Sequence, residues 1–242
     1  MADAQANEAT KNIGLRGITV ADSKISFVDG NAGKLIYRGY TIQDLAEKAT
    51  FEEIIYLLLV GRLPSEQALA AIHNDLAQSR ALPDEIIAGL KARPDTAAPM
   101  DVMQGAVTAL ADFDSGKDSE DRNAAFSSCL KLISRFATAA ASWQRIRNGK
   151  APVTPDKDLS HAGAFLQGVW GRRPTTEEAK LMDLLLVLHA EHTFNASTFA
   201  VREVASTQSH LYASVSAGVG ALSGALHGGA NEAVMDMMKA IR

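Results

Sequence analysis

A chain of 242 residues, of which 47% are apolar and only 6% aromatic, is long enough to bury a sizeable core that must be built mainly from aliphatic side chains. Its formal net charge of −4, without a dense run of Lys or Arg, argues against nucleic acid as a partner. A single cysteine, Cys129, excludes an intrachain disulfide and fits a reducing compartment.

The sequence shows no sign of export or of a membrane span. Residues 1–12 are polar, lack the apolar core of a secretory signal and predict a disordered tail. The most apolar stretches, residues 54–60 and 211–226, are shorter than the roughly 20 residues that a span needs. Gly220 and Gly224 have the spacing found in membrane-helix dimers, but close packing inside a soluble core is the favoured explanation. We therefore expect a cytoplasmic protein.

Strands are predicted only near the start of the chain. Apolar and polar residues alternate over residues 25–27 and again over residues 35–37. Between them, residues 29–33 (Asp-Gly-Asn-Ala-Gly) are typical of a turn. The pattern predicts a β-hairpin.

Helices are predicted nearly everywhere after Thr41, so the expected fold class is mainly α. Thr50 with Glu53, and Thr175 with Glu178, have the spacing of a capping box at a helix start. Residues 112–123 form an acidic loop that separates two helical blocks.

Three of these helices can be described further. Residues 123–147 predict one long helix with apolar side chains at core spacing. Residues 211–226 read as one buried helix, rich in Ala, Gly and Ser, to which neighbouring backbones can come close. The helix that follows Thr175 carries four leucines predicted to point inward, at positions 181, 184, 185 and 188.

His227 is the first candidate for chemistry, because it lies between an apolar helix and the pair Gly228-Gly229. The glycines let the backbone turn tightly and approach a ligand. A helix that starts at Ala230 or Asn231 aims its free N–H groups at the turn and disfavours imidazolium. A neutral imidazole can donate a hydrogen bond to a carbonyl that becomes an enolate. The alternative is a core histidine bonded to a nearby carbonyl.

A second polar cluster precedes the 211–226 segment. His189 and His192 are three residues apart and share one face of a helix end. Asn195 offers an amide and Ser197 a hydroxyl at the start of the next helix, where either can serve simply as an N-cap. His189 is given a structural role. A zinc site of His189, Glu191 and His192 is disfavoured, because the spacing is wrong and no cluster completes it.

The motifs "HAEHTFNASTF" and "GALHGGANEAV", with "ISFVDGNAGKLIYRGYTIQDLAEKATFEEIIYLLLVGRLPS" near the start, resemble the citrate synthase family, which includes 2-methylcitrate synthases. The resemblance implies a multi-helical large domain over residues 41–229, preceded by a β-hairpin leader over residues 13–40. Residues 230–242 would be the first helix of a truncated small domain. The chain differs from the more common sequence of the family's motifs at Glu191, Thr193 and Ala225.

As a citrate synthase, the chain would be a transferase of the tricarboxylic acid cycle and a homodimer. The family condenses acetyl-CoA with oxaloacetate to give citrate and CoA, without a cofactor or a metal. A 2-methylcitrate synthase that uses propionyl-CoA and a non-catalytic binding or assembly subunit are the alternatives, and an unrelated metal-dependent hydrolase is a distant third.

The resemblance also assigns roles to individual residues. His227 matches the catalytic, enolising histidine; His192 and Asn195 match substrate-binding residues, and Ser197 matches a residue that supports the enolising histidine. The family's base aspartate, second histidine, CoA-binding loop and most carboxylate-binding arginines follow the position of Arg242. We find no match for them here, so the chain alone is expected to be inactive.

Overall fold

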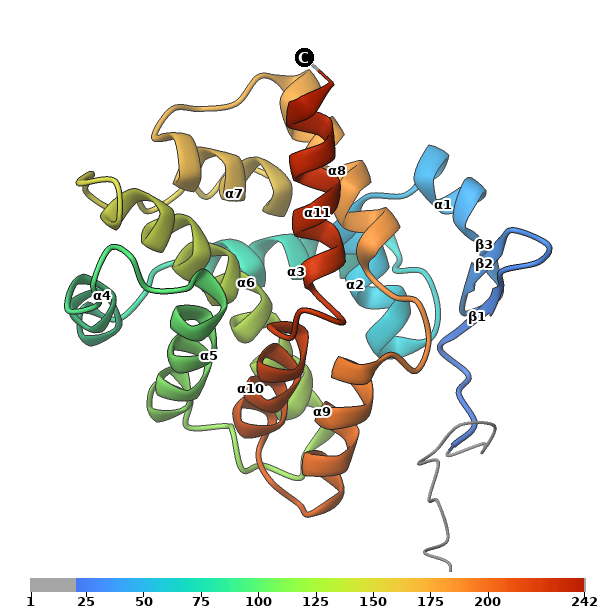
Figure 1. The fold of residues 1–242 in the computed structure, drawn as a ribbon. Helices are drawn as coiled ribbons and strands as arrows, with labels where there is room; N and C mark the ends of the chain where they lie inside the picture. The colour runs from blue at the N-terminus through green and yellow to red at the C-terminus, as the bar shows by residue number, and fades with distance from the viewer. Residues whose placement is uncertain (1–20, 242) are drawn as a thin grey trace, which may run out of the picture.

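The computed structural model describes residues 21–241, so the tail predicted over residues 1–12 lies outside the described residues. The chain is mainly α-helical, with a small sheet at one side of the helices (Figure 1). The strands are β1 (Ser26–Asp29), β2 (Lys34–Tyr37) and β3 (Tyr40–Thr41). The helices are α1 (Ile42–Lys48), α2 (Phe51–Val60), α3 (Glu66–Gln78), α4 (Asp84–Lys91), α5 (Pro99–Leu110), the 3-10 helix η1 (Ala111–Phe113), α6 (Arg122–Ile146), α7 (His161–Trp170), α8 (Thr176–His189), α9 (Ala196–Ser206), α10 (Leu211–Leu222) and α11 (Gly229–Ala240).

The predicted hairpin is confirmed and gains a third, very short strand. The strands pair antiparallel in the order β1-β2-β3, with Ser26 opposite Tyr37. Arg38 and Gly39 both have positive φ angles, 50° and 95°, which suit a two-residue turn between β2 and β3. Tyr37 is fully buried, and its hydroxyl donates to the carbonyl oxygen of Val187 at 3.2 Å. The sheet is thereby fixed to the end of α8, next to the predicted polar cluster.

The helix starts largely follow the sequence signals. Both predicted capping boxes are present, at Thr50 for α2 and at Thr175 for α8. The long predicted helix is α6, displaced by one residue at each end. The largest core cluster joins α4, α5, α6 and α10, with Leu110, Trp143 and Tyr212 buried in it.

The prediction that the leucines of α8 point inward is wrong. Leu181, Leu185 and Leu188 are 61%, 43% and 39% exposed, and Leu184 is half-buried. The helix packs on α1, α2 and α7 through its other face, where Val187 is fully buried. Spacing of i, i+4 and i+7 places the three exposed leucines on one face, which no described part of the chain covers.

The prediction of one helix over residues 211–226 is also wrong at its C-terminal end. α10 ends at Leu222, and the hydroxyl of its C-cap residue Ser223 donates to the carbonyl oxygen of Gly220 at 2.7 Å. Leu226 is fully exposed in the turn that follows. The expected close approach does occur, because a Cβ on Gly218 would overlap Val201 of α9. The small residues therefore serve the contact between α9 and α10.

A buried carboxylate, which sequence reasoning did not identify, ties three segments together. Asp114 follows η1, and its side chain is fully buried. It accepts hydrogen bonds from the Lys131 ammonium of α6 at 2.8 Å and from the Tyr212 hydroxyl of α10 at 2.9 Å. The N–H group of Gly116 adds a third donor at 3.1 Å. The loop that we read as a separator is therefore a junction of the core.

Asp183 of α8 is expected to make stability depend on pH. Burial is the main cause that raises the pKa of Asp183 to about 6. The N–H of Phe51, which donates to the carboxylate at 3.1 and 3.2 Å, acts to lower this pKa, whereas the charge of Glu52 raises it further. Because the folded-state pKa is raised, the folded protein favours the protonated form; this stabilisation is present below about pH 4 and is lost as the pH rises through about 6.

We therefore expect Asp183→Asn, which keeps an acceptor for Phe51, to raise the free energy of unfolding at pH 8 by about 2 kcal/mol and to change it little at pH 4. Urea unfolding at both pH values measures this. Asp75→Asn, at an exposed position of α3, is the control. Equal effects of Asp183→Asn at the two pH values would contradict the assignment.

Candidate functional site

Four residues singled out in the sequence lie in one continuous chain of hydrogen-bond distances. Asn195 Nδ2 lies 3.0 Å from His192 Nε2, and Asn195 Oδ1 lies 2.7 Å from Ser197 Oγ. Ser197 Oγ in turn lies 3.0 Å from His227 Nε2, across 30 residues of sequence. The loop after α8, the start of α9 and the turn after α10 thus converge at one place.

Asn195 sets the direction of the hydrogen bonds in this cluster, because it is also the N-cap of α9. Its Oδ1 accepts the N–H of Thr198 at 2.8 Å, which fixes the oxygen end of the amide. The amide nitrogen therefore faces His192 and donates to Nε2. An imidazole nitrogen that accepts a hydrogen bond carries no proton, so in this contact the ring proton of His192 is on Nδ1. That N–H is a donor left for a ligand, since His192 is exposed.

Ser197 has one hydroxyl proton and two neighbours that can accept it. If the hydroxyl donates to Asn195 Oδ1, its oxygen accepts a hydrogen bond from the Nε2–H of His227. If it donates to His227 Nε2 instead, a neutral His227 carries its proton on Nδ1 and offers it to a ligand. The orientation of one hydroxyl thus selects which face of His227 can donate.

A compact turn presents His227. The N–H groups of His227 and Gly228 both donate to the carbonyl oxygen of Gly224, at 2.9 and 3.1 Å. A Cβ at position 228 would overlap the carbonyl oxygen of Leu222, so only glycine fits there. α11 starts at Gly229, slightly earlier than predicted, and its N-cap Gly228 offers no capping side chain. The half-buried His227 therefore lies beside a helix N-terminus without a side-chain cap.

The loop that carries His192 has a support that sequence reasoning missed. Thr193 has a φ of 77°, a rare conformation for a β-branched residue. Glu191 Oε1 accepts the N–H of Thr193 at 2.6 Å and the hydroxyl of Ser26 at 2.8 Å. The N–H of Glu191 donates to the hydroxyl of Tyr37 at 3.2 Å. The β-sheet therefore holds this strained loop, through partners about 150 residues away that no local pattern could reveal.

His189 makes none of the hydrogen bonds that connect the four residues. Its Nδ1 lies 2.7 Å from the carbonyl oxygen of Leu185, one turn earlier in α8. Over residues 21–241, no three His, Cys, Asp or Glu side chains are grouped so that they could hold a metal ion. None of the helices in this part of the chain is both long and apolar enough to cross a membrane.

The arrangement offers two imidazoles as hydrogen-bond donors, one from each side of the Asn195–Ser197 bridge. In the described part of the chain, no carboxylate makes a hydrogen bond to any of these four side chains. The site can therefore bind and polarise carbonyl or carboxylate oxygens.

The chain is similar to known proteins over nearly all of its length. A family model described as "Citrate synthase, C-terminal domain" matches residues 14–242. The chain is 42% identical over 231 residues to a citrate synthase of Haloferax volcanii, covering 93% of this chain and 61% of the relative. It is 40% identical to a Deinococcus radiodurans citrate synthase, covering 94% and 60%, and 39% identical to a Mycobacterium tuberculosis 2-methylcitrate synthase, covering 93% and 57%.

A solved structure is similar over nearly the whole described chain. It is the ternary complex of a Thermoplasma acidophilum citrate synthase with carboxymethyl coenzyme A and oxaloacetate, with a TM-score of 0.87 and 30% identity. The match covers 93% of this chain and 59% of that one. The chain thus spans about three fifths of the length of the citrate synthases that it matches.

Proposed function

The chain belongs to the citrate synthase family, and from this premise we propose that it forms part of the active site for the condensation of acetyl-CoA with oxaloacetate to citrate and CoA. The observation that supports the proposal is the hydrogen-bonded chain His192–Asn195–Ser197–His227. The CoA thioester is a substrate, and the reaction needs no cofactor.

In the proposed mechanism, the Ser197 hydroxyl donates a hydrogen bond to His227 Nε2, and the Nδ1–H of His227 donates a hydrogen bond to the thioester oxygen. As a base outside this cluster removes a methyl proton, that hydrogen bond stabilises the enol oxygen. The enol carbon then forms a bond to the keto carbon of oxaloacetate, which His192 Nδ1–H and the amide of Asn195 help to hold. The C=O π electrons of the ketone move to its oxygen, which takes up a proton to become the hydroxyl of citrate, while the enol becomes a thioester carbonyl again. Hydrolysis of the thioester finally releases citrate and the thiol of CoA.

We propose that the active form is a cytoplasmic homodimer that acts in the tricarboxylic acid cycle, without nucleic acid or membrane partners. The exposed leucine face of α8, which no described part of the chain covers, supports helix–helix association. Light scattering at micromolar concentration tests the assembly. A catalytically complete form that remains monomeric would refute it.

A 2-methylcitrate synthase is the second candidate, favoured by the Mycobacterium tuberculosis relative. Propionyl-CoA differs from acetyl-CoA by one methylene group, worth about 1–3 kcal/mol in a hydrophobic pocket. Comparing kcat/KM for the two thioesters in a catalytically complete form decides between them, and a propionyl preference would overturn our choice. A binding or assembly subunit without catalytic activity is the alternative in which the protein is not an enzyme.

The 242-residue chain alone is expected to show no turnover above background in a thiol-release assay with acetyl-CoA and oxaloacetate. The cluster lacks a base, and a positioned base contributes about 10²–10⁴-fold. Orientation of the two substrates, worth about 7–11 kcal/mol when complete, is also lost without the groups that hold the thioester. A hybrid that joins this chain, after Arg242, to the part of the Deinococcus relative that it does not match is the positive control. Robust turnover by the chain alone would show that the base lies within it.

A further inference from the structure

The loop between α8 and α9 carries two of the four site residues, His192 and Asn195, and its backbone is strained between them. Thr193 has a φ of 77°, in the left-handed region that a β-branched residue rarely adopts. Such a conformation costs free energy and persists only where the surrounding contacts over-determine it. The groups that hold Thr193 therefore also decide the path of the backbone that presents His192.

A single carboxylate oxygen holds Thr193 in this conformation. Glu191 Oε1 accepts the N–H of Thr193 at 2.6 Å and the hydroxyl of Ser26 at 2.8 Å. Because one oxygen takes both hydrogen bonds, Ser26 of β1 fixes the atom that fixes Thr193. A carboxylate acceptor also makes each of these bonds stronger than one between neutral groups.

The simpler explanation is that these contacts only attach the sheet to α8. Tyr37 of β2 already does so, because it is fully buried and its hydroxyl donates to the carbonyl oxygen of Val187 and accepts the N–H of Glu191. The contact between Ser26 and Glu191 joins two half-buried side chains and adds little to that attachment. What it adds is control of the loop next to Thr193.

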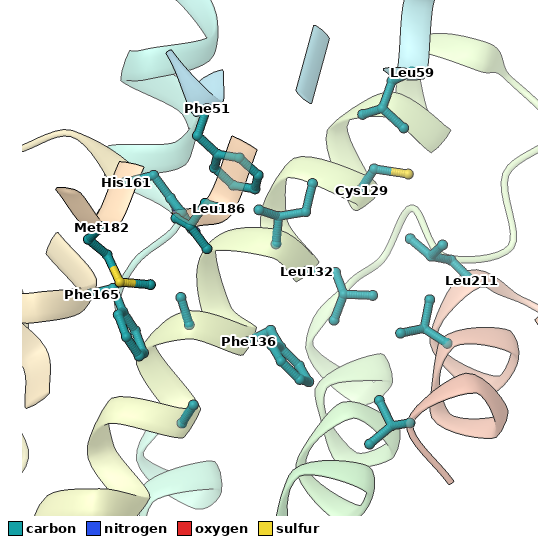
Figure 2. Close-up of a pocket in the computed structure, with 15 residues that line it drawn as sticks. Phe51, Leu59, Cys129, Leu132, Phe136, His161, Phe165, Met182, Leu186 and Leu211 are labelled. Carbon is teal, nitrogen blue, oxygen red and sulfur yellow. The ribbon is translucent and has the colours of Figure 1, made fainter. Parts of the chain in front are cut away.

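The imidazole of His192 has little support of its own. It is exposed, and in the described part of the chain the bond with Asn195 is the only hydrogen bond that its ring makes. An apolar pocket of about 550 Å³ borders the last turns of α8 at Leu186 (Figure 2), but no residue of the loop lines it. The orientation of the ring therefore depends on the backbone of its two neighbours in the sequence.

We propose that Ser26 and Glu191 are positioning residues, which hold the His192 imidazole in the orientation that a ligand of this site meets. β1 acts on His192 through the Glu191 carboxylate and the strained Thr193. For oxaloacetate as the ligand, the inference rests on the proposed function. The orientation of the imidazole in the free chain does not depend on it.

The first measurement therefore needs no substrate. At about pH 8, where an ordinary imidazole is neutral, the NMR shifts of the two ring nitrogens of His192 report which one carries the proton. In the unmodified chain the proton is on Nδ1, because Nε2 accepts from Asn195. We expect Ser26→Ala and Glu191→Ala each to release the ring, so that the shifts show a mixture of both tautomers. The double variant should match Glu191→Ala, since Ser26 acts only through Glu191.

Conservative and distant variants control this measurement. Ser26→Thr keeps the hydroxyl and Glu191→Gln keeps an acceptor oxygen, so both should retain the proton on Nδ1. Asn31→Ala, at the exposed tip of the hairpin, and Glu177→Ala, at an exposed position in the first turn of α8, should also leave the ring unchanged. If circular dichroism shows that Glu191→Ala does not fold, Ser26→Ala decides the result.

The second measurement uses the hybrid enzyme that joins this chain to the unmatched part of the Deinococcus relative. Ser26→Ala and Glu191→Ala should raise KM for oxaloacetate about tenfold, the effect of losing about one hydrogen bond to a charged group. The value of kcat and KM for acetyl-CoA should stay near those of the unmodified hybrid, and Ser26→Thr should restore KM for oxaloacetate. A merely structural role would reduce the amount of active enzyme, and so kcat, without separating the two KM values.

The outcomes separate this inference from the proposed function. A ring proton that stays on Nδ1 in both alanine variants would overturn the inference, whatever the hybrid does. Equal changes in the two KM values, or a fall in kcat alone, would also overturn it, because these mark a general loss of structure. A hybrid without turnover, combined with release of the ring in the two variants, would refute the proposed condensation and leave the positioning role standing.

Discussion

Replacing His227 by alanine is expected to lower kcat about 10²–10⁴-fold in the hybrid enzyme that joins this chain to the unmatched part of the Deinococcus relative. The imidazole is the donor that stabilises the enol oxygen, and Ser197, 3.0 Å away, sets which nitrogen holds the proton. Alanine removes the donor without adding bulk to the turn. The measurement is steady-state thiol release with acetyl-CoA and oxaloacetate, with kcat and KM determined separately.

His189→Ala is the matched control for this variant. His189 is exposed, and its Nδ1 contacts only the carbonyl oxygen of Leu185 in its own helix, so kcat should stay near that of the unmodified hybrid. Turnover by His227→Ala close to that of the unmodified hybrid would remove His227 from the mechanism.

Asp114→Ala is expected to lower the free energy of unfolding by about 2–4 kcal/mol, because it leaves the buried Tyr212 hydroxyl and the partly exposed Lys131 ammonium without their acceptor. Lys131 and Tyr212 would both lose their acceptor in the junction of α6 and α10. Urea unfolding at pH 7 measures the loss. Asp112→Ala, at an exposed position of the preceding 3-10 helix, should change stability by much less. Equal effects of the two variants would show that the junction contributes little.

The same carboxylate gives the loss a pH dependence. Burial acts to raise the pKa of Asp114, but the Lys131 ammonium and the other donors outweigh it and hold the pKa well below its usual range. Because the folded-state pKa is lowered, the stabilisation is present above the ordinary value of about 3.9 and is lost as the pH falls toward the folded-state value. The deficit of Asp114→Ala should therefore shrink below about pH 4.

Elements specified by short-range signals could be predicted from the sequence. The capping boxes at Thr50 and Thr175 depend on residues three positions apart, and the hairpin depends on alternation around one turn. Most of the candidate site is local in the same way, since His192, Asn195 and Ser197 lie within six residues. Only His227 comes from elsewhere, and the glycine turn and the resemblance to a known family pointed to it.

Features that depend on what packs against an element could not be predicted. The leucines of α8 have a core-like pattern, but α1, α2 and α7 cover the opposite face of that helix. The apolar run to Leu226 continues past the end of α10, because the chain turns back at Ser223 and not at the glycines. The roles of Asp114 and Glu191 depend on partners 17 to 165 residues away, which leave no local pattern.

The measurement that tests the proposed site most directly is a titration of the 242-residue chain with oxaloacetate, followed by the NMR resonances of its histidine imidazoles. If His192 binds oxaloacetate, its resonances should shift with one weak, saturable dissociation constant. Those of His227, which is connected to His192 through Asn195 and Ser197, should shift with the same constant. The resonances of His73, on α3, and of His210, whose Nδ1 accepts the N–H of Ala213 at the start of α10, should stay in place. Resonances of His192 and His227 that do not move, or that move no more than those of His73 and His210, would contradict the assignment of this cluster as the oxaloacetate site.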